Sequence, residues 1–353
     1  MNKDENSCPY FSICGGCSFK HLADSRDYKL KILQEKLLNL NFSGKLHSIT
    51  HVARNSRRRA TFKITNNKIS FNKLKSIETI AILNCLLLED SINALILPLN
   101  KLLGKLKTKV SMLNIMNSDT GIELLFHSDS KTDLDSDILL ASFSAEYQIA
   151  RIAWQVKNQS PFIILQNAPI QLKFNDIWVD LPINSFLQVS NESMRIMTNI
   201  ILNHLREDKK ILELYCGCGS FTISMAKKAA ILAVEGSEFA IEALEKAARR
   251  HQLPIKTMKQ DLYQNPVSAD IINDYNQIVI NPPRNGATPQ IKQIALAKSV
   301  KQVILVSCSI DNFIRDAQIL HNNGFSLENI YPIDQFLYTK HLELIGIFQK
   351  NTS

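Results

Sequence analysis

The sequence predicts an α/β protein with a Rossmann-like, mostly parallel sheet in its second half. Two observations lead to this fold class. From Lys209 onward, short apolar strands alternate with segments of helical periodicity, and the first strand ends in the glycine-bearing turn CGCGS. Residues 54–180 instead show short alternating strands, which predict a smaller α+β domain. A sheet of parallel strands places its ligands at the carboxyl ends of those strands.

The first half contains an expected helix and an expected hairpin. Apolar residues at helical spacing predict an amphipathic helix over Ser25–Leu40. The segment RATFKITNNKISFNK predicts a hairpin that turns at Asn66–Asn67, and IELLFHS and IARIAWQV are expected strands. We expect a cysteine-rich loop (1–24), a helical linker packed on the C-terminal domain (25–53), a central domain (54–180) and the C-terminal α/β domain (181–353).

In the second half, strands and helices are expected in alternation. The expected strands are KKILELYC, AAILAVEG, IKTMKQD, QIVINPPR and VKQVILVSCS, and the expected helices are FTISMAKK, SEFAIEALEKAARRH and IDNFIRDAQILHNN. The carboxyl ends of these strands carry Tyr215–Ser220, Glu235, Asp261, Asn281–Arg284 and Cys308. We therefore expect the chemistry at these positions.

The composition fits a globular protein of two or three domains, because the chain has 353 residues of which 45% are apolar. No apolar run reaches the roughly 18 residues that a membrane-spanning helix needs. The polar start MNKDENSCPY does not resemble a secretory signal. We therefore expect a cytoplasmic protein with reduced cysteines and no membrane association.

Positive charge suggests an anionic partner, since the formal net charge is +8. Basic residues gather in RNSRRRATFK, with Arg54, Arg57, Arg58, Arg59 and Lys63, and in KLLGKLKTK, with Lys101, Lys105, Lys107 and Lys109. Such runs suit a phosphate backbone. Composition alone favours this interpretation no more than a solvated basic face.

The glycine turn and an acidic strand end predict a nucleotide-like cofactor. Gly217 and Gly219 let the backbone approach a ligand, and Glu235 ends the next strand, where a carboxylate can accept bonds from ribose hydroxyls. The turn lacks the third glycine of a dinucleotide fingerprint, so S-adenosylmethionine (SAM) and NAD both remain candidates. The rigid NPPR turn at Asn281–Arg284 is typical of SAM-dependent methyltransferases that act on bases.

A thiol and a carboxyl are the candidate reacting groups. Cys308 ends a buried strand just before a helix, whose N-terminus is expected to stabilise the thiolate. His341 and Glu343 lie two residues apart on a strand-like run and share one face. The alternatives are a small buried Cys308 and an exposed Glu343 on an edge strand. Cys216 and Cys218 belong to the cofactor turn and are weaker candidates for the nucleophile.

Three cysteines near the N-terminus, Cys8, Cys14 and Cys17, predict a metal site. Zinc with a fourth ligand such as His21 is one possibility, and an iron–sulfur cluster with a distant cysteine is another. Cys85 is the remaining cysteine outside the catalytic half.

Taken together, these motifs resemble the RNA uracil-5-methyltransferase family. The matching strings, in family order, are CPYFSICGGCSFKHL, RRRATF, SFLQVS, LELYCGCGSF, AVEGS, QDLYQNP, NPPRNGA, LVSCSIDNFIRD and DQFLYTKHLE. The resemblance implies a class I SAM-dependent methyltransferase fold, an RNA-binding central domain, a monomer, and formation of 5-methyluridine in 23S ribosomal RNA. Transfer RNA is the main alternative substrate; a base amino-group methyltransferase and a non-catalytic RNA-binding protein are the others.

The resemblance also implies roles for individual residues. Cys308 would attack C6 of uracil, and Glu343 would remove the C5 proton. The residues implied for SAM are Gln188, Tyr215, Gly217, Gly219, Ser220, Glu235, Asp261 and Asn281, although many family members carry Asp in place of Asn281. A [4Fe–4S] cluster on Cys8, Cys14, Cys17 and Cys85 is implied rather than zinc. The chain starts directly at the cysteine motif, so RNA contact is expected from Arg54, Arg57, Arg58 and Arg59.

Overall fold

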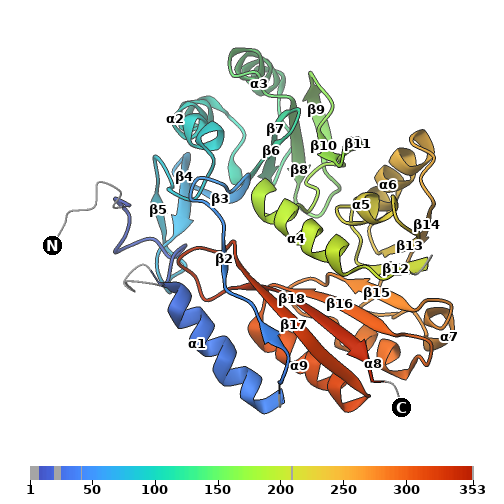
Figure 1. Ribbon diagram of the computed structural model, residues 1–353. Coiled ribbons are helices and arrows are strands. Elements are labelled where there is room, and N and C mark those ends of the chain that lie inside the picture. Colours follow the sequence, from blue (N-terminus) through green and yellow to red (C-terminus); the bar gives the residue numbers. More distant parts are fainter. Residues whose placement is uncertain (1–7, 20–24, 41, 208–209, 352–353) are drawn as a thin grey trace.

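The computed structural model describes residues 8–19, 25–40, 42–207 and 210–351, which form two large sheets (Figure 1). The sheet of the central domain has seven strands and the sheet of the C-terminal domain has nine. Within these residues, no helix is long and apolar enough to cross a membrane. His21 lies outside the described residues.

The seven-stranded sheet is antiparallel except for one parallel pair, β7 with β8. Its strand order is β5 (Thr79–Ala81), β4 (Lys68–Asn72), β3 (Arg59–Thr65), β6 (Val110–Ser118), β7 (Gly121–Ser128), β8 (Arg151–Val156) and β9 (Phe162–Gln166). The predicted turn is confirmed, because Asn66 and Asn67 join β3 to β4 with φ angles of 51° and 59°. Asparagine tolerates this left-handed conformation better than most residues. Helices α2 (Asp90–Lys105) and α3 (Leu134–Glu146) pack on the sheet.

The nine-stranded sheet contains the strand–helix alternation of the second half. Its order is β1 (Lys45–Leu46), β17 (Phe325–Asp334), β18 (Glu343–Lys350), β16 (Gln302–Ser307), β15 (Gln277–Ile280), β12 (Lys210–Leu214), β13 (Ala230–Glu235) and β14 (Ile255–Lys259), with β2 (Thr50–His51) beside β17. Strands β12 to β16 are parallel, as predicted, whereas β18 runs antiparallel to β16 and β17. Because β12 lies between β13 and β15, the strand order reverses there and opens a crevice at the carboxyl ends.

Helices cover both faces of this sheet. They are α1 (Ser25–Leu37) with a 3₁₀ turn (Leu38–Leu40), α4 (Asn191–His204), α5 (Thr222–Met225), α6 (Glu238–Arg250), α7 (Ala269–Ile272), α8 (Thr288–Leu296) and α9 (Ile310–Asn322). Successive strand residues face opposite layers. Ile211 packs in the cluster that contains α4, α5 and α6, and Leu212 packs in the cluster that contains α1, α8 and α9. The sheet is therefore buried on both sides.

Two segments differ from the expected boundaries. The expected helix Ser25–Leu40 is α-helical only to Leu37. The hairpin of β10 (Gln171–Phe174) and β11 (Ile177–Asp180) was expected in the central domain. Its apolar side chains, including Leu172 and Val179, instead pack in the core cluster of the nine-stranded sheet. Alternating strand sequences predict a hairpin but not which of two cores receives its apolar face.

Candidate active site

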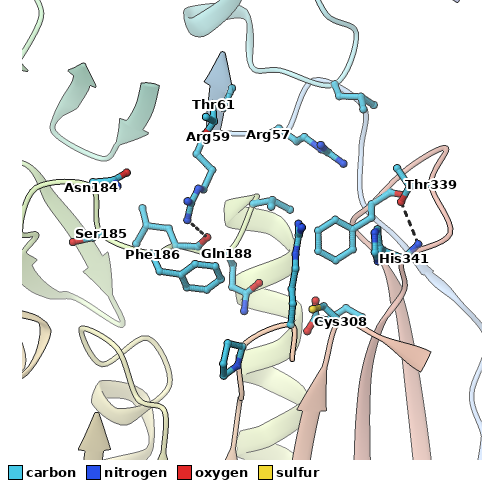
Figure 2. Close-up of a pocket in the computed structure, with 18 of the residues that line it drawn as sticks. Arg57, Arg59, Thr61, Asn184, Ser185, Phe186, Gln188, Cys308, Thr339 and His341 are labelled. Atoms are coloured by element: carbon cyan, nitrogen blue, oxygen red, sulfur yellow. Dashed lines mark hydrogen bonds between the residues drawn. The ribbon is translucent and has the colours of Figure 1, made fainter. Parts of the chain in front are cut away.

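A cavity of about 1430 Å³ lies between the central domain and the carboxyl ends of the catalytic strands (Figure 2). Its walls include the N-terminal cysteine loop, the start of β3, the segments 82–88 and 182–189, the loop before β18, and the ends of β12, β13, β15, β16 and β18 that face the central domain. In Figure 2, Arg57 and Arg59 enter from the side of the central domain, and Cys308 lies on the opposite side. The site thus spans both domains.

The glycine turn after β12 is shaped by left-handed backbone. Gly217 has a φ of +56° and Gly219 a φ of +93°, conformations that favour glycine. The Gly217 N–H donates to Oε2 of Glu235 at 3.1 Å, while Oε1 of Glu235 accepts from the N–H groups of Gly236 and Ser237, both at 2.9 Å. These bonds hold the Glu235 carboxylate beside the turn, where its remaining lone pairs face the cavity that it lines.

The residues of this crevice fit a nucleoside cofactor. Among the described side chains, the buried Tyr215 hydroxyl has no hydrogen-bond partner, and burial together with nearby carboxylates raises its pKa to about 12. A protonated hydroxyl of this kind is available as a donor to a ligand. Of the residues implied for SAM, those that line the cavity are Gln188, Tyr215, Gly217, Ser220, Glu235 and Asn281.

Two residues expected at the cofactor do not line the cavity. Asp261 follows β14, and its Oδ1 accepts from the N–H groups of Tyr263 and Gln264 at 3.0 and 3.2 Å. Gly219 packs against Leu244 of α6, where a Cβ would clash. Gly219 thus shapes the turn by close packing, whereas Asp261 is exposed and lies near enough to Tyr215 for its charge to raise the pKa of that hydroxyl.

The candidate nucleophile and base lie opposite each other. In the antiparallel pair of β16 and β18, Ser307 is the partner of Leu344. Cys308 and Glu343 are the next residues toward the cavity, and both line it. The Glu343 side chain is buried, with 3% of the residue exposed. The alternative of an exposed edge carboxylate is therefore wrong for Glu343.

Burial sets the protonation of both groups. It raises the pKa of Glu343 to about 7, against a smaller lowering by the hydrogen bond from Gln335 and by Arg284. It also raises the pKa of Cys308 to about 11, reinforced by the Glu343 carboxylate and opposed by Arg284. The expected lowering of the Cys308 pKa at the start of α9 is thus wrong, because desolvation exceeds the favourable field of the helix.

Gln335 is the residue of this site that sequence reasoning missed. Its Nε2 donates to Oε2 of Glu343 at 2.6 Å and to Oε1 of Gln188 at 3.2 Å. Its Oε1 accepts from the Ser193 hydroxyl at 2.6 Å. The signal in the sequence was slight: a polar residue directly after a strand, eight positions before Glu343.

The loop after β15 is held by α9. Asn312 donates through Nδ2 to the Arg284 carbonyl at 2.5 Å, and Asp316 accepts from Ala287 N–H and the Thr288 hydroxyl. Within the described part of the chain, the Arg284 guanidinium has no hydrogen bond or ion pair, and it lines the cavity. The loop therefore presents an unpaired cation near Cys308 and Glu343.

The four arginines expected to contact RNA separate into two groups. Arg57 and Arg59 line the cavity, and Arg59 lies 5.1 Å over the ring of the exposed Phe186 (Figure 2). Arg54 lies 5.4 Å over the ring of Tyr338. Arg58 does not belong with them: it is 1% exposed, and its guanidinium bonds Asn191 Oδ1 and the Gln188 carbonyl.

The prediction that Arg58 contacts RNA is therefore wrong. Arg58 joins the start of β3 to the segment that carries Gln188. The lysines of KLLGKLKTK belong to α2 and the residues after it, and none of them lines the cavity.

The four expected cluster ligands line one cavity. Cys8, Cys14, Cys17 and Cys85 all lie on its wall. In the described ranges of the chain, no group of three or more His, Cys, Asp or Glu side chains is placed to hold a metal ion. The geometry therefore does not support the predicted [4Fe–4S] cluster. Cys216 and Cys218 are buried, and burial raises the pKa of both thiols, as suits a structural role.

Comparison with known proteins shows which families and relatives the chain resembles. The model of the family described as "Methyltransferase small domain" matches residues 189–302, and that described as "tRNA (Uracil-5-)-methyltransferase" matches residues 268–352. The chain is 28% identical to the 23S rRNA (uracil(1939)-C(5))-methyltransferase RlmD of Mannheimia succiniciproducens, covering 98% of this chain and 82% of that protein. Over nearly its whole length, the chain is therefore similar to RNA (uracil-5-)-methyltransferases.

Two further comparisons agree with this similarity. An uncharacterized RNA methyltransferase of Brucella suis is 28% identical over 98% of this chain and 84% of its own length. The fold matches that of the Pyrococcus abyssi tRNA (uracil-54, C5)-methyltransferase in complex with S-adenosyl-L-homocysteine. The TM-score is 0.75 at 20% identity, over 98% of this chain and 87% of that one. The fold is that of a class I SAM-dependent methyltransferase, as predicted.

Proposed function

We propose that this chain transfers a methyl group to C5 of a uridine in RNA, with 23S ribosomal RNA as the substrate. The observation that carries the proposal is the placement of Cys308 and Glu343. They lie opposite each other at the ends of β16 and β18, in the cavity that the cofactor crevice opens into. A base amino-group methyltransferase needs no such thiol, and a non-catalytic RNA-binding protein needs neither group.

The two groups divide the chemistry. The Cys308 thiol releases its proton to solvent, and the thiolate sulfur bonds to C6 of uracil, which moves the electron pair of the C5–C6 double bond to C5. SAM, when bound, would supply the methyl group that C5 takes up and would be left as S-adenosyl-L-homocysteine. The Glu343 carboxylate then removes the C5 proton, the C5–C6 double bond re-forms, and the thiolate leaves. Glu343 returns its proton to solvent after the product departs.

Other residues bind and orient the reactants. We infer that Gln188, Tyr215, Gly217, Ser220 and Glu235 hold SAM, with Asn281 between the cofactor and the base. An Asn281 amide both donates and accepts, so it suits the O4/N3 edge of uracil. Asp261 lies near Tyr215, and Gly219 lets the turn pack closely against Leu244.

The central domain is proposed to bind the RNA around the target uridine. Arg59 of β3 and Arg57 just before this strand line the cavity, and Arg54, which does not line it, lies over the ring of Tyr338. Arginines on a cavity wall suit a phosphate backbone because the guanidinium is always charged and forks two donors.

Ribosomal RNA is favoured by the N-terminal cysteine motif and by the RlmD relative, which spans nearly the whole chain. The test is to delete the gene and map 5-methyluridine in ribosomal and transfer RNA by mass spectrometry. Loss of one or more 5-methyluridines from 23S rRNA is expected. Loss from transfer RNA alone would move the substrate to tRNA, and an unchanged map would overturn the function.

A Cys308→Ser variant separates the chemical alternatives. We expect it to bind SAM as the wild type does, to form no denaturant-resistant RNA adduct, and to make no 5-methyluridine. Full activity in this variant would instead indicate methylation without a covalent step. RNA binding by a wild type that neither binds SAM nor methylates would indicate a binding protein.

The iron–sulfur cluster stays a prediction that rests on the family resemblance. It is tested by metal analysis of protein purified without oxygen. We expect iron and sulfide in equal amounts, and a visible absorption spectrum of the kind that [4Fe–4S] proteins show. Zinc without iron would contradict the prediction.

A further inference from the structure

We propose that Gln335 is a positioning residue for the methyl transfer: its carboxamide holds the Glu343 carboxyl against the cavity, and a buried ion pair from α1 holds Gln335. The inference rests on the proposed function, since it assigns a purpose to Glu343 as the base. Three sets of contacts carry it.

The first set is the complete bonding of the Gln335 side chain, which is 3% exposed. A carboxamide has one oxygen and two N–H bonds. The oxygen accepts from the Ser193 hydroxyl, and the nitrogen donates to Glu343 and Gln188. An ionised Glu343 carboxylate can only accept, so the amide nitrogen must face Glu343 and the amide oxygen faces the Ser193 hydroxyl. The carboxamide thus has one orientation, and the Glu343 carboxyl has one fixed donor.

The second set links the base to the cofactor crevice. Gln188 accepts the Gln335 N–H through its Oε1, so its own amide N–H bonds are the polar groups left for a ligand in the cavity that it lines. Gln335 therefore connects Glu343 to Gln188 on the wall of the crevice. A shift of Gln335 would move the base and a wall of the crevice together.

The third set fixes the backbone on both sides of Gln335. Lys29 of α1 donates through Nζ to Oδ1 of Asp334 at 2.6 Å and to the Phe336 carbonyl at 3.0 Å. Lys29 and Asp334 are both fully buried. Asp334 ends β17, whose Ile333 is the strand partner of Glu343. Helix α1 lies beside β2 and β17 in Figure 1. The contacts of Lys29 therefore connect α1 to the strand that pairs with Glu343.

The Gln335 bond favours the charged form of Glu343. The charged and titratable groups near Glu343 are Cys308 after β16 and Arg284 after β15. His341, on the loop that joins β17 to β18, also lines the cavity. Arg284 and the Gln335 bond both lower the Glu343 pKa, whereas burial raises it. Without the bond, the pKa rises further, and a higher pH is needed to ionise the base.

The experiment compares wild type with Gln335→Met, which keeps the length of the side chain and loses both donors. Methylation of a 23S rRNA fragment is measured from pH 5.5 to 9, together with the denaturant-resistant RNA adduct. The control is Gln290→Met on α8, where another fully buried glutamine bonds both Val267 N–H and Val267 carbonyl, away from the cavity. SAM binding and thermal melting show that each variant is folded.

For Gln335→Met we expect a rate lower by about tenfold to a hundredfold at pH 7, as for loss of a bond to a charged group. We also expect the acidic limb of the pH–rate profile to move to higher pH. The adduct should accumulate, because only its breakdown needs the base. Gln290→Met should change none of these beyond its effect on melting. If Gln335→Met does not fold, Gln335→Asn, whose amide is too short for both bonds, should give the same shifts.

Two results are distinguishable. A wild type that makes no 5-methyluridine would overturn the proposed function and the positioning role with it. The positioning role alone would be overturned if the wild type is active and Gln335→Met has the wild-type acidic limb of the pH–rate profile and the wild-type amount of RNA adduct.

Discussion

Glu343 is buried near Cys308 and Arg284 at the start of β18, and this environment sets its acidity. Desolvation raises the pKa of Glu343 to about 7, from an ordinary value of 4.5. A base with a pKa near the working pH is half ionised and still basic enough to take a proton. The same burial makes the folded state less stable, since a carboxyl in this position holds its proton more tightly than in the unfolded chain.

We predict that Glu343→Gln abolishes product formation and traps the RNA adduct. Glutamine keeps the shape and accepts the Gln335 N–H, but it cannot take the C5 proton. The adduct should form at a rate near that of the wild type and then persist. The measurement is a denaturing gel of labelled RNA with time; failure of the adduct to persist would contradict a role of Glu343 after methyl transfer.

The same substitution should stabilise the fold in a pH-dependent way. Below pH 4.5, Glu343 is neutral in both states and contributes nothing. Between pH 4.5 and about 7 the folded state binds more protons than the unfolded state, so wild-type stability falls as pH rises. The gain from Glu343→Gln should therefore grow across this window to about 3 kcal/mol at pH 8. Urea unfolding of both proteins at pH 5 and pH 8 measures it.

At the scale of elements, α1 is tied to β17 through one buried ion pair. Lys29 and Asp334 are fully buried, and burial lowers the Lys29 pKa against the opposing effect of Asp334. Such a pair adds little net stability, yet removing one partner leaves a buried charge uncompensated. The pair therefore specifies where α1 packs on the sheet.

We predict that Lys29→Met lowers the free energy of unfolding by about 3–5 kcal/mol. The double variant Lys29→Met/Asp334→Asn should recover a large part of the loss, because no buried charge then remains. Lys36→Met on the same helix removes a surface pair with Asp311 and should cost under about 1 kcal/mol. Equal losses for Lys29→Met and Lys36→Met in urea unfolding would argue against the buried pair.

A second connection between elements runs from β3 to the segment before α4. Arg58 bonds the Gln188 carbonyl and Asn191, and the Val189 carbonyl accepts the Arg58 N–H at 2.9 Å. A buried ion pair between Glu123 and Arg151 supports the same region, since Arg151 also donates to the Leu181 carbonyl. The central domain thus positions the residues that wall the cofactor crevice.

At the scale of the whole molecule, the central domain contributes cationic side chains to the cavity wall, and the C-terminal domain contributes the candidate reacting groups. Arg57 and Arg59 come from one, and Cys308, Arg284 and Glu343 from the other. The Arg57 guanidinium makes no ion pair with another described side chain. An RNA strand in the cavity would supply the missing negative charge.

We predict that Arg57→Gln weakens RNA binding and makes its salt dependence shallower. Loss of one phosphate contact should reduce the slope of log affinity against log salt by about 1. The control is Lys107→Gln, at an exposed position paired with Asp135 and away from the cavity. Filter binding between 50 and 300 mM salt measures both slopes; an unchanged slope for Arg57→Gln would remove it from the RNA contacts.

The alternation of strands and helices after Lys209 was readable in the sequence, because apolar periodicity and glycine turns are local signals. The hairpin turn at Asn66–Asn67 and the strand-end positions of Gly217, Glu235 and Cys308 follow from the same signals. The predicted lowering of the Cys308 pKa was wrong, since this pKa depends on how deeply the thiol is buried. Arg58 was misassigned for the same reason: four arginines close in sequence look alike until their burial is known.

By itself, the sequence determined the parallel sheet, the cofactor turn and the identity of the two candidate reacting groups. Each of these depends on neighbours within a few residues of chain. Only the tertiary structure brought Glu343 opposite Cys308, turned Arg58 inward, and joined Lys29 to Asp334 across 305 positions. These contacts depend on strand pairing and on the packing of distant segments. The physical reason is that burial and proximity, which set pKa values and hydrogen bonds, are properties of the folded chain.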